Sequence, residues 1–163
     1  MSTRSCIIVK VRKEDIEKKL SYGSRNGKCE TTITKPYIMV YCHWNGYPCD
    51  NGRVLLDGYN SYEKALDIMK GGSLSHIETN ECDYYMDWDR KEEWEYNRPI
   101  QTDTLEPYSS WCVWAYIFDE GKWNVGHVID ENGNCEIKNV IELTEGIVEN
   151  EAKIGRASCR GRV

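Results

Sequence analysis

Runs of β-branched and aromatic residues alternate with polar turn formers along most of the chain. Residues 5–12 are rich in Ile and Val and predict a central strand. Two more strands are predicted at 31–34 and 37–44, and Pro36 between them ends the first or confines it to a sheet edge. Residues 13–30 hold many turn formers and few apolar positions, which predicts a loop.

A helical period replaces this alternation at residues 61–70. Apolar residues recur there at i, i+3, i+4 and i+7, Asn60 is the predicted N-cap, and two glycines end the period. Such a helix has one apolar face, which we expect to pack on a sheet. Residues 54–59 predict one or two further helical turns, whereas 78–109 show no sustained period and predict irregular structure.

The C-terminal third predicts a β-meander, with strands at 111–118, 123–129 and 135–143. Asn132-Gly133 is a strong hairpin signal because both central residues of a type I′ turn need positive φ. Strands at both ends with one main helix between them predict an α+β fold: a single domain over residues 1–152, with an antiparallel or mixed sheet, the helix at about 61–70 packed on one face, and the C-terminal meander.

Residues 153–163 differ from the rest of the chain because they are basic and aperiodic. They resemble the conceptual translation of a sequencing adapter, so we predict a non-native tail; the alternative is a natural basic tail that binds nucleic acid. Subtracting its four positive charges from the net charge of −6 leaves −10 for residues 1–152. A domain with this net charge repels the phosphate backbones of nucleic acids, so we expect no direct nucleic-acid binding. If the protein has a charged partner, we expect that partner to be basic.

Composition excludes several further classes. No apolar run reaches the roughly 18 residues of a membrane helix, and the N-terminus lacks a signal-peptide apolar region, so we expect no membrane partner. The 8 cysteines contain no C-x-x-C pair. Without evidence of secretion they predict reduced thiols, and neither a structural metal site nor a cofactor is expected.

Residues 41–48, Tyr-Cys-His-Trp-Asn-Gly-Tyr-Pro, place several polar and aromatic side chains at a predicted strand end, where functional loops are common. An arginine offers a bidentate fork, histidine and asparagine donate, and aromatic rings stack, which suits an anionic or nucleotide-like ligand. The alternative is a structural role, in which the rings stabilise a tight turn and bind no ligand. The candidate ligand-binding residues are Arg4, His43, Trp44, Asn45 and Tyr47.

The opening Met-Ser-Thr-Arg-Ser, the block His43 to Pro48 and the Glu63-Lys64-Ala65 helix together resemble a family of small uncharacterised proteins of bacteriophages and prophages. The resemblance covers most of residues 1–76. It implies a phage origin, and it carries no activity with it. Because no membrane helix or signal peptide is predicted, we expect the protein to act in the cytoplasm of the host bacterial cell. Members usually have Asp where this chain has Asn45.

Residues 83–96 are dominated by acids and aromatics. One interpretation is a solvated acidic face. The functional one is a surface that docks onto a basic host protein by imitating a charged backbone. The candidate protein-binding residues are Asp87, Trp88, Asp89, Glu92, Glu93 and Trp94.

The sequence thus predicts a phage accessory binding protein, an inhibitor of a host defence or regulatory factor, which binds a basic protein or sequesters a nucleotide-like ligand. No catalytic residue is assigned. The alternative is a small metal-dependent hydrolase or nuclease that uses Asp87, Asp89 and Glu92 with His43 or His76. That alternative requires the three carboxylates to converge within about 5 Å, close to the coordination distances of hard cations.

Overall fold

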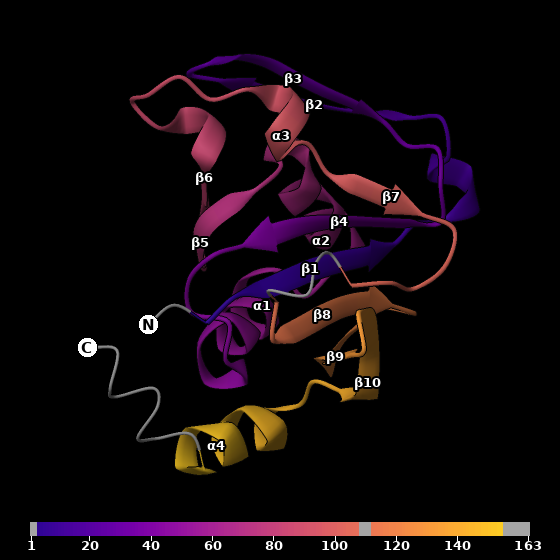
Figure 1. Ribbon diagram of the computed structural model, residues 1–163, viewed down its shortest axis with the longest axis vertical. Helices are drawn as coiled ribbons and strands as arrows, with labels where there is room; N and C mark the ends of the chain where they lie inside the picture. Colours follow the sequence, from indigo (N-terminus) through magenta and orange to yellow (C-terminus); the bar gives the residue numbers. More distant parts are fainter. Residues whose placement is uncertain (1–2, 108–111, 155–163) are drawn as a thin grey trace.

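The computed structural model describes residues 3–107 and 112–154, with backbone alone for 151–154. A mixed sheet of eight strands forms its centre, in the order β10-β9-β8-β1-β4-β5-β6, with β7 paired to β4 (Figure 1). Its strands are β1 (Ser5–Lys10), β4 (Tyr37–Cys42), β5 (Leu74–Glu78), β6 (Glu81–Tyr84), β7 (Ile100–Thr102), β8 (Trp114–Asp119), β9 (Lys122–Glu131) and β10 (Asn134–Glu142).

Strand β1 lies in the middle of this sheet, as predicted. It pairs antiparallel with β4 and parallel with β8, and β4 in turn pairs antiparallel with β7 and parallel with β5. Strands β8, β9 and β10 follow one another antiparallel, which confirms the C-terminal meander. The predicted α+β fold with a mixed sheet is therefore confirmed.

Alternate residues of the central strands pack into two hydrophobic cores, one on each face of the sheet. Ile7 and Val9 of β1 enter the larger one, which helices cover, whereas Cys6 and Ile8 enter a smaller cluster on the other face. Because both faces of β1 are buried, its sequence is apolar without a break. The helices are α1 (Arg53–Gly58), α2 (Tyr62–Ile68), the short α3 (Trp94–Asn97) and α4 (Glu145–Ile154).

Helix α2 matches the predicted helix, but its N-cap is Ser61 rather than Asn60. The Ser61 hydroxyl accepts a hydrogen bond from the Lys64 backbone N–H at 3.2 Å. Serine and asparagine cap equally well, so the sequence alone did not discriminate between the neighbours. The helix continues as a 3-10 turn, and Gly72 ends it with φ of 76°.

The predicted loop at 13–30 is wrong. Strands β2 (Lys19–Ser24) and β3 (Gly27–Thr32) form a separate two-stranded sheet there. In β3, Cys29 and Thr31 are buried while their neighbours are exposed, so the strand period of two is present. It is carried mostly by polar residues, which hides it from a count of apolar positions.

The region 78–109, predicted as irregular, holds β6, α3 and β7. These elements are three or four residues long, too short to establish a period. The hairpin prediction at Asn132-Gly133 is confirmed, because the two residues have φ of 54° and 81°. Helix α4 runs to Ile154, past the predicted boundary at 152, and residues 155–163 of the predicted tail lie outside the described residues.

Among the described residues, six cysteines are not disulfide-bonded, namely Cys6, Cys29, Cys42, Cys82, Cys112 and Cys135. Cys49 is disulfide-bonded, which the prediction of reduced thiols missed. Among the helices of residues 3–107 and 112–154, none is both long enough and apolar enough to cross a membrane.

Candidate functional site

The N-terminal strand and the His-Trp-Asn-Gly-Tyr-Pro corner lie together, joined by a side chain that the sequence did not single out. Arg4 Nε donates to the Tyr41 hydroxyl at 2.9 Å, and the same oxygen lies 2.6 Å from His43 Nδ1. The phenol can accept from the guanidinium and donate to the imidazole. Tyr41 was detectable in principle, because it lies two residues from His43 on the same strand face.

His43 is held in its neutral form. Burial lowers the pKa of its imidazole, and the positive charge of Arg4 lowers it further. The ring also contacts Trp44 edge-on, with 4.8 Å between the ring centroids. The corner therefore presents a neutral histidine beside a permanent cation and a Trp44 side chain that is 43% exposed.

The backbone of the corner fixes the next two residues. Asn45 has φ of 62°, a left-handed conformation that Asn, Asp and Gly adopt with least cost. Gly46 donates from its N–H to the Thr3 carbonyl at 2.8 Å, and a Cβ at Gly46 would lie 2.6 Å from that oxygen. These contacts support a structural role for Asn45 and Gly46. Tyr47 packs half-buried against the main core.

Asn51 stabilises the corner through hydrogen bonds of its buried side chain, and the sequence analysis did not identify it. Its side-chain amide is fully buried and donates to the Trp44 carbonyl at 3.0 Å. The same nitrogen lies 3.3 Å from Ser5 Oγ and 3.5 Å from Cys42 Sγ, which ties β1, β4 and the corner together. Burial raises the pKa of the Cys42 thiol to about 12, so this thiol stays protonated and unreactive.

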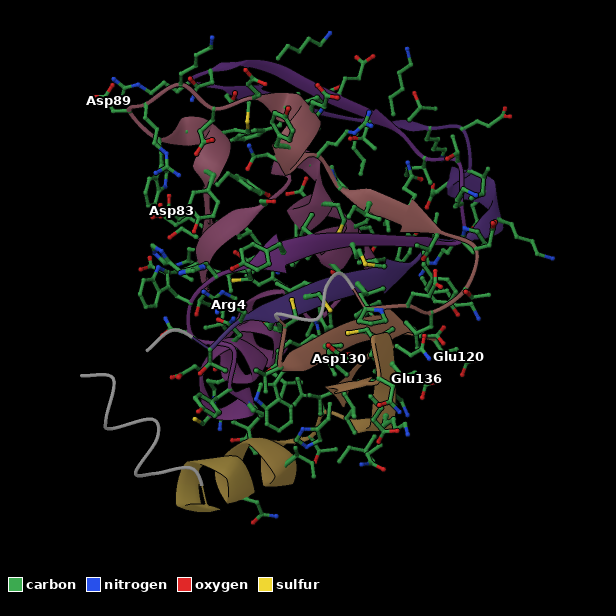
Figure 2. All side chains as sticks on the ribbon, in the orientation of Figure 1. Arg4, Asp83, Asp89, Glu120, Asp130 and Glu136 are labelled. Atoms are coloured by element: carbon green, nitrogen blue, oxygen red, sulfur yellow. The ribbon has the colours of Figure 1, made fainter. Side chains whose placement is uncertain are left out.

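The acidic segment 83–96 is mostly engaged within the protein. Asp87 accepts hydrogen bonds from the Tyr22 hydroxyl and from the Arg25 backbone N–H. Asp89, at the upper left of Figure 2, forms an ion pair with Arg25 at 3.0 Å. Both carboxylates thus fasten the β2–β3 hairpin to this segment.

A second local network of contacts within the protein involves Glu92 and Trp88. Arg90 pairs with Glu92 at 2.6 Å and lies over the Trp88 ring, 4.7 Å from its centroid. The Trp88 indole N–H donates to Asp83 at 3.1 Å. Of the remaining predicted protein-binding residues, Glu93 is exposed, and the Trp94 indole N–H donates to the Glu30 carbonyl at 3.3 Å.

The geometry contradicts the convergence that the hydrolase alternative requires. Asp87, Asp89 and Glu92 each have a separate partner, and no group of three or more His, Cys, Asp or Glu within the described ranges could hold a metal ion. His76 instead pairs with Asp83, at 3.2 Å from Nδ1.

A hollow of about 410 Å³ lies beside this segment, and we call it the acidic hollow. Four carboxylates and three phenol rings surround it, together with Lys70. The acids are Asp67, Glu81, Asp83 and Asp87, and the rings are Tyr22, Tyr59 and Tyr84. A second hollow, of about 440 Å³, lies next to the first and shares Tyr59, Asp67 and Asn80 with it.

The carboxylates and ring faces of the acidic hollow favour a cation. Burial raises the pKa of Tyr22, and the hydrogen bond to Asp87 and its charge raise it further. Burial likewise raises the pKa of Tyr59, the neighbouring Cys82 raises it further, and Asp67 and Glu81 contribute less. The Lys70 ammonium lies 2.9 Å from Asp67 Oδ2 and 5.8 Å from the centroid of the Tyr22 ring, so the hollow already accommodates one ammonium group.

Sequence reasoning found Asp87 and the segment around Asp83 but missed the rest of this hollow. Tyr22 comes from β2, Asp67 from α2 and Glu81 from β6. Such a site depends on how three elements pack, and no local spacing indicates it.

No model of a known protein family, no curated protein and no solved structure matches this chain.

Proposed function

We propose that this protein is a binding protein that takes up a basic segment of a partner protein in the acidic hollow. The observation that carries the proposal is the grouping of four carboxylates around three phenol rings in a concave site of about 410 Å³. Carboxylates supply charge attraction, and ring faces supply cation–π contact, which together favour lysine or arginine side chains.

The spacing of the acids favours an organic cation over a metal ion. The carboxylates of the hollow do not form a group that could hold a metal, within the part of the chain that the structure describes. Asp67 and Glu81 are exposed, so a docking partner can reach them. Lys70 occupies one edge beside Asp67, and an incoming cation would bind next to it or displace it.

The corner with Arg4, His43 and Trp44 supports a nucleotide-like ligand less well. Arg4 and His43 are bridged by Tyr41, and Asn45 and Gly46 are tied to backbone groups of neighbouring segments. None of these residues lines the acidic hollow. We therefore place ligand recognition at the hollow.

The resemblance to phage and prophage proteins extends this proposal to a biological setting. A phage accessory protein that acts in the cytoplasm of its host meets many nucleic-acid-binding host proteins, whose surfaces are basic. An acidic hollow can compete for such a surface because opposite charges steer association. We propose that the partner is a host defence or regulatory factor of this kind.

Isothermal titration calorimetry with the blocked peptide Ac-Gly-Lys-Gly-Lys-Gly-Lys-NH2 tests the proposal. Asp67→Asn combined with Glu81→Gln removes two reachable charges of the hollow, and we expect affinity to fall about tenfold, with the remaining binding weakened by salt.

The matched control is Asp130→Asn combined with Glu136→Gln. It removes the same charge from two exposed acids in the lower half of Figure 2, away from Asp83 and Asp89. An equal loss in both double variants would show attraction to net charge alone, and it would contradict a site at the hollow.

A further inference from the structure

A third hollow, of about 490 Å³, lies between β3 and the segment that leads into β7. We call it the strand groove. Its walls come from β3 at residues 30–32, from Trp94 of α3 and from residues 98–101. In Figure 1, α3 and β7 lie below the β2–β3 hairpin, and two hydrogen bonds described below connect them to β3.

One edge of β3 faces this groove. Within the described chain β3 pairs with β2 alone, and Ile33 continues that pairing by donating to the Lys18 carbonyl at 2.9 Å. Because backbone groups alternate in direction along a strand, Glu30 and Thr32 direct theirs away from β2. A strand edge of this kind is a template for another strand.

The side chains that contact this edge imitate a strand. The Gln101 carboxamide donates to the Thr32 carbonyl at 3.0 Å and accepts from the Thr34 backbone N–H at 2.8 Å. A carboxamide has the same donor and acceptor as a peptide group. One step further along β3, the Trp94 indole N–H donates to the Glu30 carbonyl at 3.3 Å, a longer bond that a backbone N–H could replace.

The groove also offers contacts for side chains. Arg98 is exposed, and its guanidinium has no ion pair or hydrogen bond within residues 3–107 and 112–154. Ile100 is 40% exposed and Trp94 is half-buried, which provides apolar surface beside the strand edge. An unpaired cation next to such a surface complements a carboxylate on an extended chain.

We propose that the strand groove binds an extended peptide segment that carries an acidic residue. The segment pairs with the outer edge of β3 by donating to the Glu30 carbonyl in place of the Trp94 indole and by accepting from the Thr32 N–H, while the Thr32 carbonyl stays bonded to Gln101. Its carboxylate lies at Arg98, a case of β-strand addition. This site uses the opposite charge to the acidic hollow and residues that do not line it, so it stands independently of the proposed function.

The test uses the blocked peptide Ac-Thr-Val-Asp-Val-Thr-NH2 and ¹⁵N-labelled protein. We expect the backbone amide signals of Glu30 and Thr32 and the Trp94 indole signal to shift, and the two backbone amides to exchange more slowly with solvent. Arg98→Gln should weaken binding of this peptide about two- to fivefold, the range for an exposed ion pair, and leave binding of the matching Asn peptide unchanged.

A peptide methylated on its backbone nitrogens cannot form the ladder, so it should cause none of these changes. Equal shifts with the methylated peptide, or shifts confined to β6 and β10, would overturn the proposal. So would changes at Glu30 and Thr32 that depend on protein concentration alone, because they would assign this edge to pairing between copies of the chain.

Discussion

At the scale of single residues, the corner between β4 and α1 contains residues that backbone conformation explains without any role in ligand binding. Asn45 looks like a ligand donor in the sequence, yet its positive φ is a sufficient reason for Asn or Asp at this position. The backbone also explains Gly46, because only a residue without a side chain can approach the Thr3 carbonyl so closely. The glycine and asparagine of the motif are thus explained by the turn.

Gly46→Ala tests this explanation. The added methyl group would lie 2.6 Å from the Thr3 carbonyl, so the N-terminal segment has to shift, and we expect a loss of about 1–3 kcal/mol in the free energy of unfolding. Urea denaturation measures the loss. Gly23→Ala is the control, because a methyl group there meets nothing within 4 Å. Equal stability of the two variants would contradict the close approach.

His43 gives a second residue-scale prediction. Its pKa is lowered in the folded state, so below the usual histidine value of about 6.5 the unfolded chain binds the proton more readily. The free energy of unfolding that the protein has above that pH should therefore decline as the pH falls below it. Between pH 7 and 5 the wild type should lose more stability than His43→Gln, measured by thermal unfolding. Parallel curves would show that His43 makes no contribution to this decline.

At the scale of elements, the β2–β3 hairpin depends on side-chain contacts rather than on the main sheet ladder. Tyr22 and Arg25 bond Asp87, and Asn26 donates from its side chain to the Met86 carbonyl at 2.8 Å and the Trp88 carbonyl at 3.2 Å. The hairpin forms one wall of both the acidic hollow and the strand groove. Its attachment therefore shapes both proposed sites.

Asn26→Ala removes two of these bonds, each worth about 1 kcal/mol. We expect hydrogen exchange of the β2 and β3 backbone amides to accelerate about tenfold or more, while exchange of β1 amides in the centre of the sheet changes little. If β1 accelerates to the same extent, the hairpin opens only with the whole domain, and the local attachment described here is wrong.

The elements that the sequence predicted correctly share a physical property. Strand β1, helix α2 and the β9–β10 hairpin carry their own signal, in buried apolar residues, a helical period and an Asn-Gly turn. The hairpin of β2 and β3 does contain the turn pair Asn26-Gly27, but its strands are mostly polar, and tertiary contacts to Asp87 and Met86 hold it in place. The residues of the acidic hollow escaped prediction for the same reason, since they meet only after packing.

At the scale of the whole molecule, acidic charge is abundant but unequally available. In segment 83–96, Asp89 and Glu92 pair with arginines and Asp87 bonds the β2–β3 hairpin. The net charge of −6 for the whole chain therefore overstates the negative charge that a partner can reach. Acids of the hollow such as Glu81 remain exposed beside phenol rings. Recognition in this account depends on that local arrangement and not on total charge.

Nuclear magnetic resonance of the tyrosine rings tests this claim most directly. On addition of Ac-Gly-Lys-Gly-Lys-Gly-Lys-NH2, the ring signals of Tyr22 and Tyr59 should shift in a saturable way, and backbone signals around Asp130 and Glu136 should stay constant. Shifts that gather at Asp130 and Glu136, or that spread evenly over all exposed acids while Tyr22 and Tyr59 stay unchanged, would contradict a cation site in the acidic hollow.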